Sequence, residues 1–473
     1  MRVKCPEIWS AEHSSRESAK HVSSRKETAQ HRITVTVLLL ASVAVFYGFQ
    51  QLIWPNSAPP HDLLQEAWSW CGVLWTVAVI PAVFETVGLY LWRAPRGTEL
   101  FIPQRVCWRI VSRGINREAL TESIEACRRE MARTPLFRYT IEVVVDSNPE
   151  ALGLPAAGGD LTYVTVPADY QTENGTAAKA RALNYALWNS SINGTMTWIV
   201  HMDEESHPTR SGIIGIANAI HEEVLRTTAD PSLTPRVGQG MITYHREWKH
   251  HPFFTLSDCI RTGSDVGRLY FAMKIGVPLF GLHGSYILIR NDVEERVGFD
   301  IGRRGSLTED AWWGTLAMDR GVRCRWVEGY VAEQCTQRVS DFFKQRGRWF
   351  NGLVRTSLTA PSSFRWRVML TVSMLAWACA PFAWLYTLGH LALGGYVSPE
   401  IRALANFSLA VYVATTLVGL RVNMREHGIT KLAQKIRWSL TWLVCLPLFS
   451  LMESAAVARA IIRPARDFHV VKK

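Results

Sequence analysis

The stretch TWIVHMDEESH, residues 197–207, is the most informative part of the sequence for the fold of this chain. Its apolar run at 198–200 is bounded by polar residues and predicts a short buried strand, which ends on three successive carboxylates, Asp203, Glu204 and Glu205. Carboxylates on alternate residues at a strand end can converge on one point, and oxygen ligands suit a hard cation such as Mg²⁺ or Mn²⁺. We therefore expect a metal and nucleotide site here, with a solvated acidic turn as the alternative.

Length, charge and cysteine content narrow the class of protein. The 473 residues leave room for about two to four domains. The net charge of +11 comes from basic residues that flank apolar segments, which favours a membrane surface as partner over nucleic acid. The nine cysteines are scattered without a CxxC pair, so we expect neither a zinc site nor a disulfide framework, and a reducing cytoplasmic environment is the simpler assumption.

Two apolar segments lie near the start of the chain. Residues 1–32 are polar and basic and predict a disordered cytoplasmic tail. Residues 33–54 are apolar and uncharged, and residues 68–92 are apolar with tryptophans near both ends and one embedded acid, Glu85. The sequence thus predicts two transmembrane helices within 33–92. The loop between them has acids and no lysine or arginine, so we expect it outside.

From about residue 97 to residue 340 the hydropathy falls and predicted strands alternate with helices. Strands are expected at 105–114, 139–146 and 162–167, and helices at 116–133 and 176–188. This alternation predicts a mostly parallel sheet, whose ligands gather at the carboxyl ends of the strands. Asp146 and Asp203 both end strands in this scheme, so two acids are expected at one edge of the sheet.

This order of elements, together with four short motifs, resembles a family-2 inverting membrane glycosyltransferase with the GT-A fold. The motifs are the KARALN run at 179–184, the glycine-rich acceptor segment GLHGSYILIR at 281–290, the TED motif in LTED at 307–310 and the QxxRW signature in QRGRW at 345–349. Each string alone is weak, but together they stand in the family's order. The resemblance covers residues 97–360. It implies an α/β, Rossmann-like GT-A catalytic domain over 97–340, inserted between N- and C-terminal transmembrane helices.

The acids and Lys179 predict how a nucleotide-sugar donor would be bound. The departing diphosphate needs a Lewis acid, and Mg²⁺ or Mn²⁺ supplies one. Asp203 and Glu205 are the predicted metal ligands, although the family more often has aspartate at the second position. We expect Asp146 to accept hydrogen bonds from the base or ribose, and Lys179 to meet the base or a phosphate. The alternative for Lys179 is a solvated helix lysine.

The TED motif predicts the catalytic base. Inversion by direct displacement needs a base on the acceptor hydroxyl, and we expect Asp310 to serve, with Glu309 beside it. Asp310 opens a predicted helix over 310–320, where a carboxylate is electrostatically favoured. The alternative is that Asp310 or Thr308 only caps that helix.

The resemblance also implies residues that bind the acceptor. It places Arg348 near the diphosphate and Trp349 at the acceptor sugar, with Gln345 positioning them. A planar apolar ring suits the C–H face of a sugar. Gly284 and Ser285, from the glycine-rich segment, are further expected acceptor contacts.

The C-terminal third returns to the membrane. Residues 341–360 mix aromatic and basic side chains and predict an amphipathic helix at the membrane interface. Residues 368–462 contain three apolar runs, at 368–393, 403–420 and 438–462, which predict transmembrane helices. Three crossings would place the basic tail, 463–473, outside, against the positive-inside rule. We therefore expect the last run to be broken and the tail to be cytoplasmic.

Within the family, the chain most resembles the egghead-type β-1,4-mannosyltransferase group. This resemblance implies transfer of mannose from GDP-mannose to a lipid-linked or glycan acceptor, with a cytoplasmic catalytic domain on a bacterial plasma membrane or on the ER or Golgi. No single residue selects guanine over uracil, so a processive polysaccharide synthase of the cellulose or hyaluronan synthase type, using a UDP-sugar, is an alternative. An inactive sugar-binding membrane scaffold is another, disfavoured because Asp203, Asp310 and QxxRW occur together.

Overall fold

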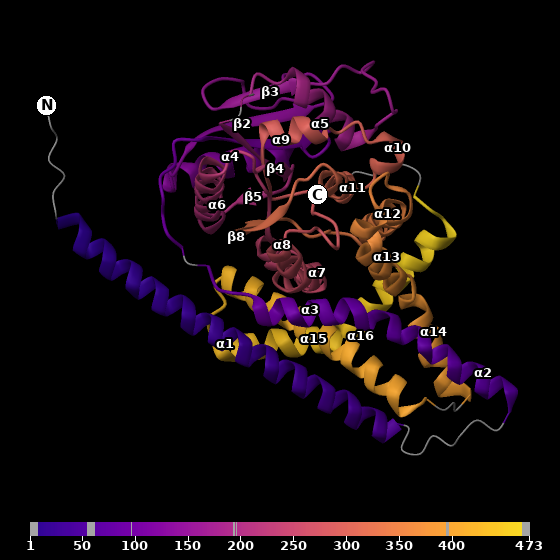
Figure 1. The fold of residues 1–473 in the computed structure, drawn as a ribbon. Helices are drawn as coiled ribbons and strands as arrows, with labels where there is room; N and C mark the ends of the chain where they lie inside the picture. Colours follow the sequence, from indigo (N-terminus) through magenta and orange to yellow (C-terminus); the bar gives the residue numbers. More distant parts are fainter. Residues whose placement is uncertain are drawn as a thin grey trace, which may run out of the picture.

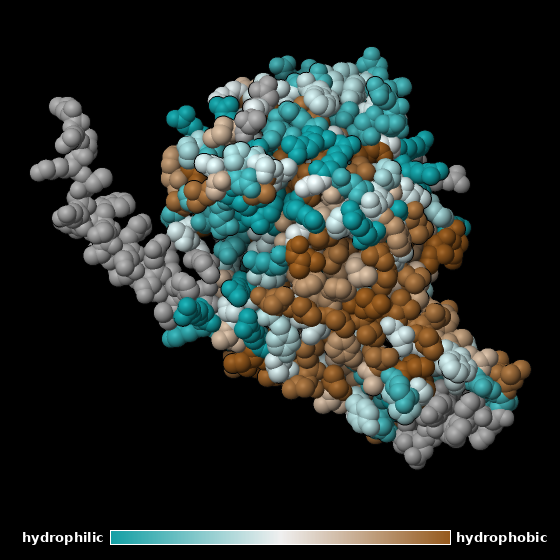
Figure 2. Space-filling view, viewed as in Figure 1, coloured by the Kyte–Doolittle hydropathy of each residue, from teal (hydrophilic) through white to brown (hydrophobic). Residues whose placement is uncertain are grey.

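The computed structural model describes residues 8–53, 62–95, 97–192, 194, 196–393 and 397–465. An α/β domain lies above a layer of long helices (Figure 1). The helices of this layer are α1 (Ile8–Ile53), α2 (Leu63–Cys71), η1 (Gly72–Ala78), α3 (Val79–Leu91), α13 (Phe364–Ala378), α14 (Ala380–Leu393), α15 (Pro399–Glu426) and α16 (Leu432–Ile462). Apolar side chains gather over this layer, below a mostly polar α/β domain (Figure 2).

An eight-stranded sheet forms the centre of the α/β domain, in the order β3-β2-β1-β4-β7-β6-β8-β5. The strands are β1 (Arg105–Ser112), β2 (Arg138–Val145), β3 (Leu161–Thr165), β4 (Thr197–Asp203), β5 (His207–Pro208), β6 (Val237–Thr243), β7 (Ile287–Arg290) and β8 (Cys324–Ala332). The first four are parallel to one another, β6 is parallel to β8, and only β7 and β5 run antiparallel to their neighbours. The predicted α/β fold with a mostly parallel sheet is confirmed.

Helices cover both faces of the sheet because its strands alternate buried side chains between two apolar cores. The helices of the domain are α4 (Arg117–Arg133), α5 (Ala178–Asn189), α6 (Arg210–Ala229), η2 (His245–Trp248), α7 (Pro252–Ser264), η3 (Asp265–Leu269), α8 (Tyr270–Ile275), α9 (Asn291–Val297), α10 (Gly302–Gly305), α11 (Glu309–Asp319) and α12 (Val339–Thr359). On β1, Trp108 packs with α4 and α6, whereas its neighbour Cys107 packs with the core that includes α5, α9 and α11. In sheets of this kind, ligands gather at the carboxyl ends of the strands.

Strand register brings the acids to one edge of the sheet. Every residue of β4 except Asp203 is buried, as expected for a central strand covered on both faces. Val111 of β1 pairs with Asp203, and Ser112 pairs with Val145, the last residue of β2. Asp146 follows directly, so Asp146 and Asp203 lie at the ends of β2 and β4, the two strands that flank β1.

The first helix corrects one prediction. Residues 1–32 were expected to be disordered, but α1 begins at Ile8 and continues to Ile53. No proline or glycine occurs between residues 8 and 47, so nothing in the backbone chemistry ends the helix that the apolar segment begins. Residues 1–7 and most of the expected outside loop, 54–61, fall outside the described residues.

Five helical segments are long and apolar enough to cross a membrane, by length and composition. They are Arg25–Leu52, Leu63–Leu91, Phe364–His390, Pro399–Glu426 and Leu432–Ile462, and each contains or overlaps a predicted span. The break was expected in the last of them, but the third is the one that is interrupted, at Cys379 between α13 and α14. Pro381 lacks the N–H that would continue the first helix.

The last segment, expected to be broken, is instead the continuous helix α16 with Pro447 inside it. Both of its ends meet the side on which the α/β domain lies. Near its start, the rings of Trp438 and Trp248 lie 5.1 Å apart. Near its end, Asn351 of α12 donates a hydrogen bond of 3.3 Å to the carbonyl of Ala460. Packing along this whole length outweighs the one backbone hydrogen bond that Pro447 removes.

Candidate active site

The three acids of the 197–207 stretch point in different directions. Glu204 is 7% exposed, and its carboxylate accepts hydrogen bonds from Asn116 Nδ2 at 2.5 Å and from Ser112. Asp203 and Glu205 are only partly buried. The central acid therefore fastens β4 to the β1–α4 turn, while Asp203 and Glu205 on either side of it are the more exposed acids.

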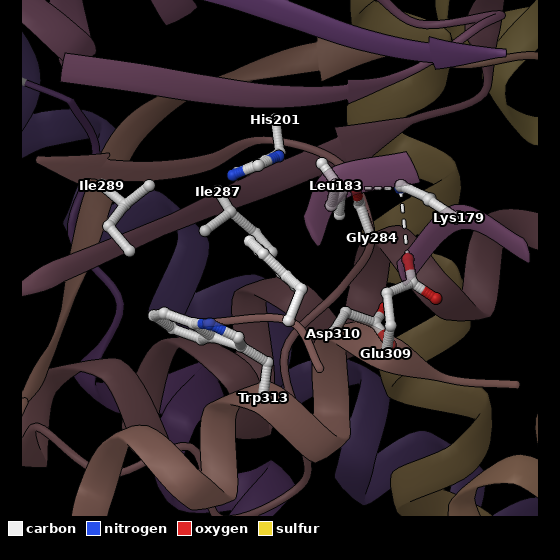
Figure 3. A pocket seen from close by; sticks show the side chains of 10 residues that line it. Lys179, Leu183, His201, Gly284, Ile287, Ile289, Glu309, Asp310 and Trp313 are labelled. Atoms are coloured by element: carbon white, nitrogen blue, oxygen red, sulfur yellow. Dashed lines mark hydrogen bonds and ion pairs between the residues drawn. The ribbon is translucent and has the colours of Figure 1, made fainter. Parts of the chain in front are cut away.

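Lys179 lies at the centre of the site (Figure 3). Its Nζ is 2.5 Å from Asp203 Oδ1, donates to the Gly284 carbonyl at 2.9 Å and lies 3.4 Å from Glu309 Oε1. Burial opposes the charge of Lys179, but the carboxylates of Asp203 and Glu309 outweigh it and raise the pKa of Lys179 above its ordinary value. The solvated-lysine alternative is therefore wrong. Ala178, just before it, has a left-handed φ of +52°, a strained conformation that marks this helix start.

Asp310 faces Asp203 across Gly284. A Cβ atom built on Gly284 would lie 3.2 Å from Lys179 Nζ, 3.4 Å from Asp310 Oδ2 and 3.5 Å from Asp203 Oδ2, so these groups converge on a point that a side chain would occupy. Burial, and then the Glu309 carboxylate, raise the pKa of Asp310 to about 7. Asp310 is therefore poised to accept a proton near neutral pH.

The alternative that the TED residues only cap α11 has little support. Thr308 occupies the cap position, but its side chain makes no capping hydrogen bond. Asp310 Oδ1 accepts a hydrogen bond of 2.8 Å from the N–H of Ala311, and its other oxygen faces the site.

A pocket beneath these residues has one polar and one apolar wall (Figure 3). Lys179, Glu309 and Asp310 lie together on one side, and Ile287, Ile289 and Trp313 lie on the other (Figure 3); Leu183, His201, Gly284 and Phe299 complete the lining. The apolar wall lowers the local dielectric, which strengthens the electrostatic interactions among the three charged groups.

Asp146 lies farther along the sheet edge and is already paired. Arg181 NH2 is 2.7 Å from Asp146 Oδ1, and Arg113 Nε is 3.9 Å from Oδ2. The Asp146 side chain is 29% exposed, so an oxygen remains accessible to a ligand. Its predicted contact with a base or ribose stays a prediction.

The QxxRW segment reaches the acids from α12. Arg348 donates to the Leu307 carbonyl at 3.3 Å and lies close enough to Glu309, Asp203 and Asp310 for their charges to act on it. Burial lowers the pKa of Arg348, although these carboxylates oppose the change. The structure therefore brings together the QxxRW arginine, the TED acids and the acid that ends β4.

Two residues that were expected to contact the acceptor, Ser285 and Trp349, make contacts with other protein side chains. Ser285 is fully buried, and its Oγ is 2.8 Å from Ser206 Oγ, so its side chain faces the core and cannot touch an acceptor directly. The Trp349 ring lies under two guanidinium groups, with Arg261 Cζ 4.2 Å and Arg346 Cζ 4.5 Å from its centroid. Gln345 accepts a hydrogen bond of 3.1 Å from Arg346, which agrees with a positioning role.

Four further residues near the site were not predicted from the sequence: Tyr244, Arg261, Asp265 and His283. Only His283 carried a usable signal, since it stands directly before Gly284 in the glycine-rich segment. Tyr244 directly follows β6, Arg261 is on α7 and Asp265 begins η3, and the packing of these elements brings them near Trp349.

The predicted metal requires more than protein ligands. Among the described residues, no group of three or more His, Cys, Asp and Glu side chains could hold a metal ion. Lys179 donates to Asp203 Oδ1, and Asp203 Oδ2 and the partly exposed Glu205 carboxylate are the candidate oxygen ligands. Two carboxylates fit Mg²⁺ or Mn²⁺ when diphosphate oxygens and water complete the coordination shell. The residues present therefore fit a metal that arrives with a nucleotide.

Residues 198–422 match the glycosyl transferase family group 2. The chain is 33% identical over 278 residues to β-1,4-mannosyltransferase bre-3 of Caenorhabditis briggsae, which covers 58% of each chain. It is 30% identical over 347 residues to bre-3 of Caenorhabditis elegans, covering 67% of this chain and 73% of that one. It is 27% identical over 415 residues to β-1,4-mannosyltransferase egh of Drosophila melanogaster, covering 84% and 86%.

Among solved structures, the fold is similar to that of a mannosyltransferase from Pyrobaculum calidifontis in complex with GDP-Man and Mn²⁺. The TM-score is 0.44 at 13% identity, and the match covers 91% of this chain and all of that one.

Proposed function

The chain belongs to glycosyl transferase family group 2 and is a glycosyltransferase, and from this premise we propose that it transfers mannose from GDP-mannose, with inversion, in β-1,4 linkage to a lipid-linked or glycan acceptor. The observation that carries the proposal is the convergence of Asp203, Asp310 and Lys179 on Gly284. The names of the nematode and fly relatives support mannose and the linkage.

The residues divide the chemistry between donor and acceptor. Asp310 takes the proton from the acceptor hydroxyl as that oxygen attacks the anomeric carbon, a role that its raised pKa favours near neutral pH. Arg348 compensates the negative charge of the departing diphosphate. Asp203 and Glu205 would hold Mg²⁺ or Mn²⁺ there, and the ion supplies a Lewis acid for the leaving group. Lys179 fixes Asp203 and balances the charge of Glu309.

We further propose that four segments cross the membrane and that α16 lies along its surface. Gln50 Nε2 is 2.8 Å from Asn406 Oδ1 at one end of the α1–α15 pair, and Glu27 pairs with Arg425 at the other, so these helices are antiparallel. Glu426, which follows Arg425, accepts a hydrogen bond from Tyr330 of β8. This end of the α1–α15 pair is therefore the one beside the α/β domain. Because both ends of α16 also meet that side, residues 463–465, which follow α16, lie on the side of the catalytic domain, as the positive-inside rule expects for a basic cytoplasmic segment.

A donor screen tests the proposed reaction. Detergent-purified protein is given GDP-mannose or UDP-glucose, with Mn²⁺, Mg²⁺ or EDTA, and a lipid extract as acceptor, and both nucleotide release and product mass are followed. We expect one β-linked mannose per acceptor, removable by β-mannosidase, only with GDP-mannose and metal. A long polymer from UDP-glucose would replace the proposal by the polysaccharide synthase. A fluorescent protein fused after residue 473 tests the topology, since it should be reached from the same side as the catalytic domain.

A further inference from the structure

Two arginines lie over one tryptophan ring at the start of the apolar segment Phe364–His390. Arg323 Cζ is 5.5 Å and Arg365 Cζ is 4.5 Å from the centroid of the Trp366 ring. Both arginines are exposed, and Trp366 is partly buried. Arg323 directly precedes β8 in the α/β domain, whereas Arg365 is on the first turn of α13. This cluster therefore joins the catalytic domain to a helix of the apolar layer.

The cluster lies at the boundary between the polar domain and the apolar layer. α13 runs from α12, beside the α/β domain, to α14 in the layer of long helices (Figure 1). Phe364, the first residue of α13, is 57% exposed, and residues 368–378 carry no charge. Tryptophan is enriched at membrane–water interfaces, and arginines near the end of a span extend their charge to the headgroups. If Phe364–His390 crosses the membrane as proposed, the cluster lies at the level of the headgroups on the side of the catalytic domain.

The cluster carries an excess of positive charge. Arg367 adds a third guanidinium, although it already donates hydrogen bonds to two backbone carbonyls of the preceding segment. Asp319 is the acid in contact with the cluster, and its oxygens accept hydrogen bonds from the N–H and Oγ of Ser363 and from Trp366 Nε1, at 2.6, 2.7 and 2.9 Å. The charges of Asp319 and Arg365 act on each other, but one carboxylate balances only one of three guanidinium groups.

The two guanidinium groups over Trp366 offer their N–H groups to a ligand. Across the part of the chain that the structure describes, neither Arg323 nor Arg365 donates a side-chain hydrogen bond or forms an ion pair. A guanidinium held over an aromatic ring keeps N–H groups at the edge of its plane, and a pair of them matches the oxygens of a phosphate. From this geometry we infer that Arg323 and Arg365 together bind the phosphate of an anionic phospholipid beside Trp366.

The surroundings favour a lipid headgroup over a soluble phosphate. Exposed Phe364, next to Arg365, offers an apolar surface to the first methylene groups of an acyl chain. Basic clusters at the cytoplasmic end of a membrane helix bind anionic headgroups in this way. Phosphatidylcholine would bring a quaternary ammonium to the same arginines, so a headgroup of net negative charge is favoured. A bound headgroup would connect the residue before β8 to α13 and so hold the catalytic domain against the membrane surface.

The test measures lipid binding without sugar transfer. The delipidated full-length protein in dodecyl maltoside is titrated with palmitoyl-oleoyl phosphatidylglycerol (POPG) or with the corresponding phosphatidylcholine (POPC), and bound lipid is counted by native mass spectrometry. Wild type is compared with Arg323→Gln, Arg365→Gln and the double variant. Arg437→Gln is the matched control, because Arg437 is also exposed and its Cζ lies 5.3 Å from the centroid of the Trp438 ring, near the start of α16.

We expect the first POPG to bind wild type about tenfold more tightly than POPC does. Each single glutamine variant should weaken POPG binding about tenfold, as for the loss of a charged hydrogen bond, while Arg437→Gln stays within about twofold. Because both arginines contact one phosphate, the double variant should lose less affinity than the product of the two single effects.

Four results would overturn the inference. Equal binding of POPG and POPC by wild type would contradict the anionic class. POPG affinity within twofold of wild type in either single variant, or an equal fall in Arg437→Gln, would show that the two arginines do not form a specific site. Displacement of POPG by inorganic phosphate would assign the cluster to a soluble ligand. If one single variant cannot be purified folded, the other decides by the same comparison. Because no donor is present, a failure of mannose transfer would refute the proposed function and leave lipid binding standing.

Discussion

Replacing Asp310 by asparagine separates catalysis from stability in this site. Burial and Glu309 raise the pKa of Asp310 to about 7, against ~3.9 for aspartate in an unfolded chain. Between these values the folded protein keeps a proton that the unfolded chain has released. The free energy of unfolding therefore decreases as the pH rises from about 4 to about 7, and above pH 7 the charged carboxylate costs the folded state up to ~4 kcal/mol, at 1.36 kcal/mol per pKa unit.

Asparagine has the same shape and no charge, so Asp310→Asn removes this cost along with the base. At pH 8 we expect transfer to fall by about 10²- to 10⁴-fold while the melting temperature rises. At pH 5, where Asp310 is protonated, the melting temperature should change little. A carboxylate whose only role is to cap α11 would behave in the opposite way, with normal transfer and a loss of about 1 kcal/mol of stability.

The assay measures product formation and thermal unfolding of the detergent-purified protein at pH 5, 6, 7 and 8. Asp319→Asn is the control, since it makes the same change at the other end of α11. Asp319 accepts hydrogen bonds from Ser363 and from Trp366 Nε1, the latter at 2.9 Å, and lies outside the site. It should lose stability and keep transfer within about twofold. Transfer by Asp310→Asn within threefold of wild type, or its destabilisation at pH 8, would refute the assignment of Asp310 as the base.

Further predictions concern the pH profile, the central lysine and the metal. The transfer rate of wild type should rise as the pH is raised through 7, because Asp310 then loses its proton; a rate independent of pH between 6 and 8 would contradict this. Lys179→Met should destabilise the protein by about 3–5 kcal/mol and abolish GDP-mannose binding measured by calorimetry, because it leaves two carboxylates without their shared cation. EDTA should stop transfer and Mn²⁺ restore it, and Glu205→Ala should raise the Mn²⁺ concentration for half-maximal rate. Glu204→Gln should cost about 1–3 kcal/mol of stability without changing that concentration, and equal metal dependence of both variants would argue against Glu205 as a ligand.

The elements of the catalytic domain were predictable because each has its own local pattern. The apolar run of β4 followed by acids, and the amphipathic helix over 116–133, are encoded within a few consecutive residues. Apolar length likewise predicted the membrane segments.

Prediction failed where a local pattern allowed more than one outcome. The polar segment before the first span is helical from Ile8, since composition alone does not exclude a helix without breakers. Pro447 suggested a break, but α16 continues through it and packs against α12 and α14, while the interruption lies at Cys379, between α13 and α14. Ser285 was expected at the acceptor, but the chain turns its side chain toward Ser206.

The sequence by itself therefore determined the strands and helices, the apolar segments and the acids at the sheet edge, because each depends on neighbouring residues. Only the tertiary structure decided which charges meet. Lys179 reaches Asp203 and the Gly284 carbonyl, 105 positions away, and Arg261 lies between Tyr244 and Trp349. It also decided that both ends of α16 meet the side of the catalytic domain. Such contacts join segments far apart in the chain, and no periodicity within a segment specifies which distant side chain will be its partner.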